Sequence, residues 1–230
     1  KNSYFRFGIP KFNNSIFKEI GRNGSTTFIK KIAVSLNDIL SNYINIMVAI
    51  SYAAIAAKGI QSDLFKFIFT IPSGLGDALV ALTAVYYGAN DRKGLRRLYT
   101  YSIKLGTLLS GIACIVVYIF APNLVRVFTD DRDTLSLAIF SIRLMSIGLV
   151  FDTWNILIQH YLQGIGDSKR AKLYSIINRL VAHGVSTIVL GYLFGSKGVL
   201  AAIAVSEIFS YFLYIIIRII ELKRLPHGIG

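Results

Sequence analysis

Residues 105–125, LGTLLSGIACIVVYIFAPNLV, contain no Asp, Glu, Lys or Arg. A helix needs about 20 mostly apolar residues to cross a lipid bilayer, and this stretch is long enough to do so. The rest of the chain has a similar character: of its 230 residues, 54% are hydrophobic and only 16% are charged. A soluble domain of this size needs more charged surface, so the stretch indicates a membrane protein.

Five further stretches contain at most one charged residue each, and together the six predict an all-α, polytopic membrane protein. We expect one lobe of six transmembrane helices over residues 23–222, with residues 1–22 as a cytoplasmic linker or surface-lying amphipathic segment and 223–230 as a cytoplasmic tail. Residues 121–129 are expected to form a separate short amphipathic piece that begins near Pro122. The helices are expected at about 24–49, 53–87, 92–119, 133–163, 169–193 and 197–221.

The formal net charge of +13 is distributed by loop. Basic residues dominate segments 1–22, 88–99 and 164–172 and the C-terminal end. The other connections between the predicted helices are close to neutral or acidic. This alternation follows the positive-inside rule, so we predict a multi-pass protein of the cell membrane with both ends of this segment in the cytoplasm. We interpret the charge as a topology signal with a weak attraction to anionic lipid, and we expect no nucleic-acid binding.

Polar residues recur at helical spacing inside three of the predicted helices. Offsets of three and four residues place each set on one helical face, as a stripe. A charged side chain at mid-membrane costs about 2.5–3.5 kcal/mol, so these stripes are expected to face other helices or water. We expect either a shared hydrated cavity or polar packing seams. The stripes are Ser35, Asp38, Asn42 and Asn45; Asp63, Lys66, Thr70, Ser73 and Asp77; and Asp152, Asn155, Gln159 and Gln163.

The substrate-cavity candidates within these stripes are Asn42, Asn45, Asp63, Asn155 and Gln159. Carboxylate and amide oxygens suit small cations, and a carboxylate in a poorly hydrated site exchanges a proton near neutral pH. A simple ion pair is the alternative for Asp63 and Lys66, and Arg179 and Glu207 are candidates for an ion pair between helices. His183 has no second ligand at metal spacing, so we predict a packed histidine and no metal site.

The glycine-containing motifs of this chain do not match those of enzymes. GLGDALV at 74–80 follows an apolar helix-like run and lacks the third glycine of a dinucleotide-binding fingerprint. QGIGDSK at 163–169 resembles half of a P-loop but lacks its Gly-Lys-Ser or Gly-Lys-Thr ending. With no Ser-His-Asp arrangement and no cysteine cluster, the sequence predicts a protein that is not an enzyme and that uses no cofactor beyond a coupling ion.

Five motifs occur in an order that has a known counterpart. PSGLGDALVALTAVYYGANDRKGLRR begins at Pro72, and LQGIGDSKR spans 162–170. The other three are AAIAAKGI at 53–60, APNLVRVFT at 121–129 and GSKGVLAAIAVSEI at 195–208. In this order they resemble the multidrug and toxic compound extrusion (MATE) family, in which the first ends the eighth helix and the second forms the turn between helices ten and eleven. Arg179 also stands where the family often has a basic residue.

The resemblance covers nearly the whole chain and implies the C-terminal six-helix lobe of a twelve-helix, two-lobe transporter. It implies a secondary antiporter that exports small organic cations, drugs or amphiphilic metabolites in exchange for Na⁺ or H⁺. The implied partners are the N-terminal six-helix lobe of the same protein and the lipid bilayer. Two alternatives remain open: a lipid-linked oligosaccharide flippase of the same superfamily, and a non-transporting membrane scaffold subunit.

The resemblance also assigns roles to two acids. In one branch of the family, a cation-site aspartate lies 12 residues before the glycine of the turn that follows helix ten. Asp152 lies 12 residues before Gly164. Asp38 is similar in helix and depth to a second acid of that branch. The resemblance therefore implies cation or proton binding at Asp152 and Asp38.

Proline and glycine are unusual inside the apolar stretch that contains Asp77. Pro72 removes one backbone hydrogen bond and is expected to bend the helix. Small residues allow neighbouring helices to approach closely. We expect helix bending or close packing at Pro72, Gly74, Gly76, Gly164 and Gly166.

Overall fold

The computed structural model describes residues 28, 31–32, 35–44, 46–47 and 51–224, with side chains up to residue 216. The described residues between 28 and 47 are all helical and are called the first helix below. Asn45 and the linker 1–22 lie outside the described residues. The elements that follow are α2 (Tyr52–Ile68), α3 (Thr70–Gly88), α4 (Arg92–Arg126), α5 (Arg132–Gly164), α6 (Ser168–Ile176), the π-helix η1 (Ile177–Ala182) and α7 (His183–Arg224).

Four of these helices begin at a side chain that caps the free backbone N–H groups of the first turn. Ser51 begins α2, Asp91 begins α4, Asp131 begins α5 and Asp167 begins α6. At α5 the backbone N–H of Thr134 donates to Asp131 over 2.9 Å, and this hydrogen bond lowers the pKa of the Asp131 carboxyl. Short polar residues between long apolar runs therefore fix where the helices start.

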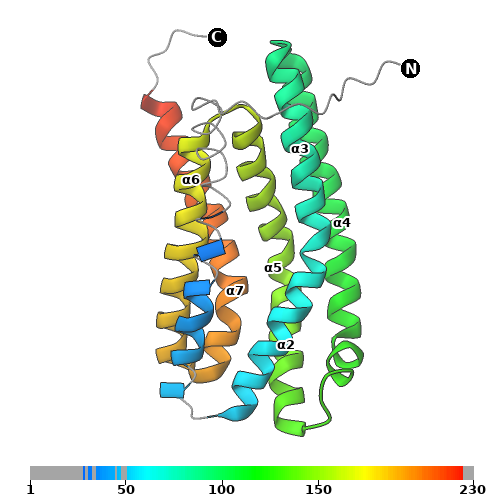
Figure 1. Ribbon diagram of the computed structural model, residues 1–230, viewed down its shortest axis with the longest axis vertical. Coiled ribbons are helices and arrows are strands. Elements are labelled where there is room, and N and C mark those ends of the chain that lie inside the picture. Colours follow the sequence, from blue (N-terminus) through cyan, green and yellow to red (C-terminus); the bar gives the residue numbers. More distant parts are fainter. Residues whose placement is uncertain (1–27, 29–30, 33–34, 45, 48–50, 225–230) are drawn as a thin grey trace, which may run out of the picture.

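The helices form one bundle whose members run up and down along a common axis (Figure 1). The loops after α3 and α5 and the C-terminal end of α7 lie at one end of the bundle, at the top of the view. The loop between α4 and α5 lies at the opposite end. The predicted basic loops 88–99 and 164–172 thus share one end, as the positive-inside pattern requires.

The second predicted span is a bent pair of helices. The axes of α2 and α3 differ by 40° at Phe69. Pro72 is the third residue of α3 and has no N–H to donate to the carbonyl of Ile68, which weakens the helix at this point. The proline is buried, so the bend is part of the packed interior.

The last two predicted spans are one helical hairpin. Gly195 has a φ of 63° and a ψ of −145°, a conformation open essentially to glycine alone, and it breaks α7. A Cβ added at Gly198 would lie 1.8 Å from the carbonyl oxygen of Leu190, although eight residues of straight helix would separate the two by about 12 Å. The chain therefore reverses between 190 and 198 (orange part of α7, Figure 1).

The end of α4 differs from the prediction. Residues 121–129 were expected to form a separate piece that begins near Pro122, but α4 continues through Pro122 to Arg126. Proline costs one hydrogen bond inside a helix, but Ala121 and Val125 are completely buried on either side of it. Burial of these neighbours outweighs the local cost and keeps the helix continuous.

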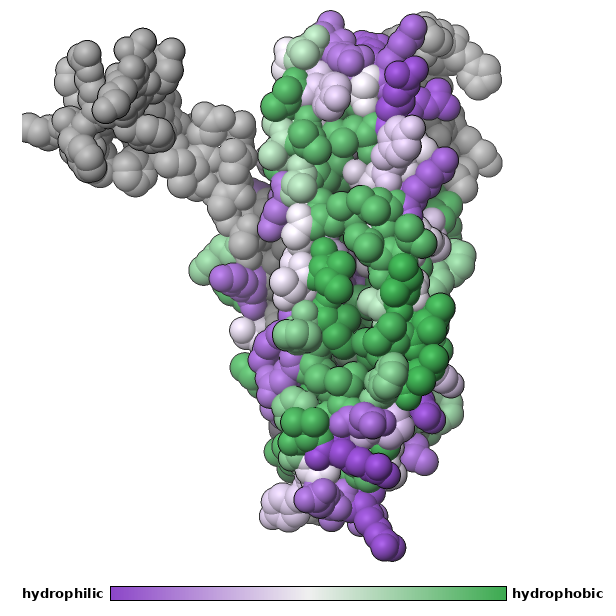
Figure 2. Space-filling model, turned by 90° about the vertical axis from the view of Figure 1, so that its right-hand side faces the viewer, coloured by the Kyte–Doolittle hydropathy of each residue, from purple (hydrophilic) through white to green (hydrophobic). Residues whose placement is uncertain are grey.

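The outer surface of the bundle is apolar at mid-height. The face that carries α3 and α4 shows a green hydrophobic band between purple hydrophilic ends (Figure 2). By length and composition, Arg92–Arg126, Arg132–Gly164 and Ser168–Ile216 are each able to cross a membrane, and the bent pair α2–α3 makes a fourth. Because Ser168–Ile216 reverses at Gly195, these segments and the first helix accommodate the six predicted spans.

Candidate functional site

Three charged side chains from three helices meet inside the bundle. The guanidinium of Arg179 in η1 donates from Nη2 to Asp152 Oδ1 over 2.9 Å, and its Nη1 lies 3.1 Å from Glu207 Oε1. The side chains of Asp152 and Glu207 are 1% and 2% exposed, and that of Arg179 is 13% exposed. This arrangement, called the charged triad below, joins α5, η1 and α7 and confirms the expected pairing of Arg179 with Glu207.

Amide side chains surround the charged triad. Asn155 donates through Nδ2 to Glu207 Oε2 over 2.8 Å, and Asn178 donates to the same oxygen over 3.0 Å. The hydroxyl of Tyr174 donates to Asn155 Oδ1. The glutamate is therefore held by two amides and a guanidinium, which offsets the desolvation of its charge.

The basic member of the charged triad, Arg179, lies where the helix type changes locally. Residues 177–182 form a π-helix, which bulges one residue outward relative to an α-helix. Asn178 and Arg179 lie on this segment, and the first helix also contacts it: Asn37 donates through Nδ2 to the backbone carbonyl of Arg179. Such bulges are frequent at functional sites, although this sequence gave no sign of one.

One oxygen of the charged triad has no partner. Asp152 Oδ2 is fully buried and accepts no hydrogen bond from any side chain or backbone group that the structure describes. A buried carboxylate oxygen without a donor is costly, because nothing replaces the water it has lost. A bound proton or a small cation would remove that cost.

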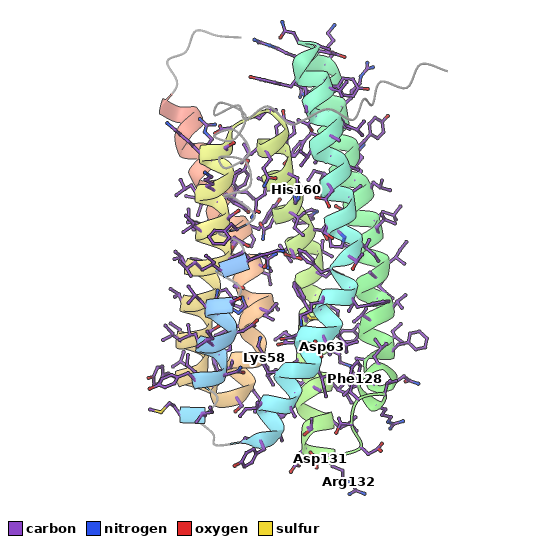
Figure 3. All side chains as sticks on the ribbon, in the orientation of Figure 1. Lys58, Asp63, Phe128, Asp131, Arg132 and His160 are labelled. Carbon is purple, nitrogen blue, oxygen red and sulfur yellow. The ribbon has the colours of Figure 1, made fainter. Side chains whose placement is uncertain are left out.

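The remaining predicted acids lie on the surface of the lobe, apart from the charged triad. Asp38 and Asn42 are exposed on the first helix, and Asp63 is exposed on α2 (Figure 3). Asp63 Oδ1 lies 3.0 Å from Lys66 Nζ, which is the simple ion pair that the sequence offered as the alternative for these two residues. In this lobe the described residues of the stripes on the first helix and on α2 therefore lie at the surface, whereas Asp152, Asn155 and Gln159 of α5 are buried.

Two of the predicted substrate-cavity residues are buried. Asn155 is 1% exposed, and Gln159 is 3% exposed and accepts a hydrogen bond from the hydroxyl of Ser175 over 3.2 Å. Both side chains join α5 to its neighbours in this structure, which corresponds to the predicted packing seam. Among the described substrate-cavity candidates, Asn42 and Asp63 have exposed side chains.

Sequence reasoning missed a buried lysine on α2. Lys58 is only 4% exposed and donates from Nζ to Gln61 Oε1 over 3.2 Å (Figure 3). Gln61 is completely buried and donates in turn to the carbonyl oxygen of Leu200 over 2.9 Å. Nothing in the local spacing distinguishes Lys58 from a lysine at the membrane surface, because its burial depends on α7.

Asp77 pairs with the one histidine of α5. His160 Nε2 lies 3.4 Å from Asp77 Oδ1, and His160 Nδ1 lies 2.8 Å from the carbonyl oxygen of Ile156. Because a carbonyl oxygen only accepts, Nδ1 carries a proton, and the contact with Asp77 is favourable when Nε2 carries one too. The side chain of Asp77 is 79% exposed, so the pair lies at the edge of the lobe.

The predicted glycine positions differ in what surrounds them. A Cβ at Gly76 would lie 2.8 Å from Ile156 Cγ2, and one at Gly164 would lie 2.5 Å from Thr83 Cβ, so both allow α3 and α5 to approach. Gly166 has a φ of 78° in the turn before α6. At Gly74 the described residues leave open space, so close packing there is not observed.

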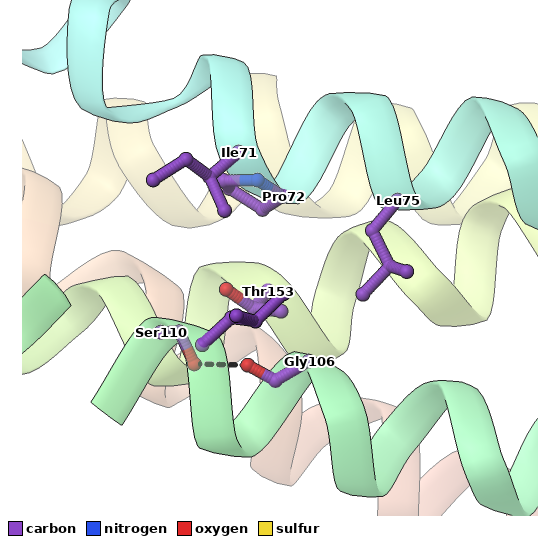
Figure 4. Close-up of a pocket in the computed structure, with 7 residues that line it drawn as sticks. Ile71, Pro72, Leu75, Gly106, Ser110 and Thr153 are labelled. Carbon is purple, nitrogen blue, oxygen red and sulfur yellow. Dashed lines mark hydrogen bonds between the residues drawn. The ribbon is translucent and has the colours of Figure 1, made fainter. Parts of the chain in front are cut away.

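A cavity of about 10 Å³ lies between α3, α4 and α5, next to Pro72, Gly106 and Thr153 (Figure 4). This is at the lower limit for a single water molecule. Within the described part of the chain, no three His, Cys, Asp or Glu side chains gather as metal ligands.

Comparisons of this chain with known proteins agree on one family. The MatE family model matches residues 27–185. Multidrug export protein MepA of Staphylococcus aureus (strain MSSA476) is 25% identical over 204 residues, which are 86% of this chain and 43% of that protein. Probable multidrug resistance protein NorM of Photorhabdus laumondii is 25% identical over 165 residues, which are 71% of this chain and 35% of that protein. The chain spans less than half the length of these curated relatives.

Solved structures share the fold. An outward-facing multidrug resistance MATE family transporter of the MOP superfamily superposes with a TM-score of 0.83 at 20% identity, over 97% of this chain and 51% of that chain. A MOP superfamily transporter from Pyrococcus furiosus superposes with a TM-score of 0.80 at 20% identity, over 94% of this chain and 49% of that chain. The bundle described above therefore corresponds to about half of each of these structures.

Proposed function

Because the chain belongs to the MatE family of multidrug and toxic compound extrusion transporters, we propose that it is one six-helix lobe of a secondary antiporter. The whole protein exports small organic cations, drugs or amphiphilic metabolites in exchange for Na⁺ or H⁺. Of the curated relatives named above, MepA is a multidrug export protein and NorM is a probable multidrug resistance protein, and both support this class of substrate. Their greater length supports a second six-helix lobe as the partner.

The observation that carries the proposal is the unpartnered Oδ2 of Asp152. Two carboxylates share one guanidinium in the charged triad, so the three groups carry a net charge of −1 when all are ionised. One proton or one Na⁺ brings this charge to zero. A site that is one positive charge short in a low-dielectric interior favours binding of a single cation.

Arg179 acts in this proposal as a tethered counter-ion. When the coupling cation leaves Asp152, the Arg179 guanidinium stays paired with Asp152 Oδ1, which lies 2.9 Å from Nη2 in the structure. This pairing limits the free-energy cost of the buried carboxylate charge. When the cation returns, the guanidinium keeps its contact with Glu207. A flippase that holds a lipid-linked pyrophosphate needs a surplus of positive charge, so the acidic balance of the charged triad favours the antiporter.

The polar stripe on α2 and α3 supports a water-filled path beside this lobe. Asp63, Lys66, Thr70 and Asp77 are exposed along the bent pair of helices. These side chains are expensive in contact with lipid, so we place the second lobe and the substrate path against them. The exposed face of α4 is apolar instead and faces lipid.

Cysteine labelling tests this assignment of faces. In the full-length protein, with its native cysteines including Cys114 replaced, we expect Thr70→Cys to react with a water-soluble maleimide in intact membranes. Ile112→Cys is the matched control, since Ile112 is 54% exposed on the apolar face of α4 but would face lipid. Equal labelling of both cysteines would contradict the proposed path.

Dye efflux tests the function itself. Cells that produce the full-length protein are expected to retain less of a fluorescent organic cation than cells with the empty vector. Collapse of the Na⁺ and proton gradients by ionophores is expected to abolish the difference. Equal retention with and without the protein, over several unrelated cationic dyes, would contradict export as the function.

A further inference from the structure

A groove on the outer face of α5 contains a cationic side chain that the charged triad does not use. Its volume is about 390 Å³, and it lies between Tyr118 of α4 and the α5 residues Ser136, Phe140, Arg143, Leu144 and Ile147. Positions 136, 140, 143 and 147 follow at intervals of three and four, on one helical face. The buried positions 138, 142, 145 and 149 of α5 occupy the other side of the helix.

Arg143 is held in place by an aromatic ring. Its guanidinium carbon lies 5.3 Å from the centre of the Tyr118 ring, within the range of a cation–π contact. Among the residues that the structure describes, no carboxylate forms an ion pair with Arg143. The positive charge is therefore oriented but not neutralised by the described part of the chain.

The surroundings of the groove are those of a lipid-facing surface. Ile115 and Ile119 of α4 are each 61% exposed, and Ile147 of α5 is 45% exposed. Apolar side chains with this much exposure in a membrane-spanning bundle contact acyl chains, so the groove opens to the bilayer.

Arg143 lies in the half of α5 that is nearer the α4–α5 loop. It lies eleven residues into α5 from Arg132, or about 16 Å at 1.5 Å per residue. Helical side chains lean toward the N-terminus, so Arg143 points back toward the α4–α5 loop. Tyr118 lies eight residues, or about 12 Å, before Arg126, which places its ring nearer that end of the bundle. The headgroup layer on each side of a bilayer is about 6 Å thick. A long arginine side chain extends several ångströms from its helix toward the nearer layer.

We propose that this groove binds one anionic phospholipid from the leaflet on the side of the α4–α5 loop. The phosphate accepts hydrogen bonds from the Arg143 guanidinium, and an acyl chain lies along Phe140, Leu144 and Ile147. Arginine donates to phosphate in a fork geometry and suits this role. A lipid with net negative charge neutralises Arg143, whereas a zwitterionic lipid brings its own ammonium group next to the guanidinium.

Native mass spectrometry of the full-length protein tests the proposal. Delipidated wild-type protein is titrated with phosphatidylglycerol or with phosphatidylcholine. We expect one phosphatidylglycerol to bind at least about tenfold more tightly to the wild type than to Arg143→Gln, since a charge-assisted hydrogen bond is lost. Arg132→Gln, which removes a charge near the same end of α5 but outside the groove, is expected to leave binding unchanged.

A second variant tests the shape of the groove independently of the positive charge of Arg143. Ile147→Trp fills the groove while it leaves Arg143 in place, and we expect it to weaken phosphatidylglycerol binding by a similar factor. Ile112→Trp makes the same change on α4 outside the groove and serves as its control. Equal binding to wild type and Arg143→Gln would overturn the proposal. So would equal binding of the two lipids to wild type, or equal losses in Arg143→Gln and Arg132→Gln.

Discussion

Arg179→Met is expected to be the most destabilising single substitution in this lobe. It leaves Asp152 and Glu207 buried without the cation that both contact, at 2.9 and 3.1 Å. Removal of one partner from a buried ion pair costs about 3–5 kcal/mol, because the remaining charge is neither solvated nor paired. We expect a clear fall in the unfolding temperature of the purified full-length protein in detergent.

The control for Arg179→Met is an ion pair at the surface. Arg170 pairs with Asp167 over 3.3 Å, and its side chain is 61% exposed. Surface pairs contribute at most about 1 kcal/mol, so Arg170→Met is expected to shift the unfolding temperature only slightly. If the two methionine variants unfolded at the same temperature, the charged triad would not be the buried network described above.

Neutralisation of the whole charged triad separates stability from transport. Arg179→Met combined with Asp152→Asn and Glu207→Gln removes every buried charge of the network. Uncharged replacements of buried ionic groups are often neutral for stability or stabilising. We therefore expect the combined variant to regain most of the stability that Arg179→Met loses but to remain inactive in dye efflux.

Asp152→Asn is expected to abolish dye efflux at unchanged levels in the membrane. The amide oxygen of asparagine still accepts the hydrogen bond from Arg179, so the packing around α5 is preserved. Asparagine carries no charge and takes up no proton, so the cation-binding property of Oδ2 is lost. We expect cells with this variant to retain as much dye as cells with the empty vector.

The control for Asp152→Asn is the same change on the same helix. Asp133 lies in the first turn of α5 and is exposed. Asp133→Asn is expected to leave efflux close to the wild-type level. Efflux at the wild-type rate by Asp152→Asn would remove this residue from the coupling mechanism, whatever the effect of the control.

Helical periodicity predicted which residues share a face but not what that face contacts. The stripe of Asp152, Asn155 and Gln159 was found from its spacing, and the family resemblance singled out Asp152. The other members of the charged triad, Arg179 and Glu207, lie 27 and 55 residues further along the chain. Pairing over such distances depends on helix packing, so spacing in the sequence predicted candidates for these contacts but not the contacts themselves.

The π-helix and the exposure of Asp38 could not be predicted from local signals. A π-helix depends on how Asn178 and Arg179 fit against α5 and α7, and its residues have no distinctive composition. Asp38 has the same spacing signal as Asp152, but it lies on the exposed side of its helix, whereas Asn37 and Ser41 of the same helix are buried. Spacing alone does not distinguish the inside of one lobe from a surface between two lobes.

The most direct test of the account is gradient-driven transport by the purified full-length protein in proteoliposomes. A fluorescent organic cation is followed under an imposed Na⁺ gradient and, separately, under an imposed proton gradient. We predict that at least one gradient drives the dye uphill with wild-type protein and that neither does so with Asp152→Asn. Uphill movement by Asp152→Asn at the wild-type rate would contradict the claim that this buried carboxylate binds the coupling cation.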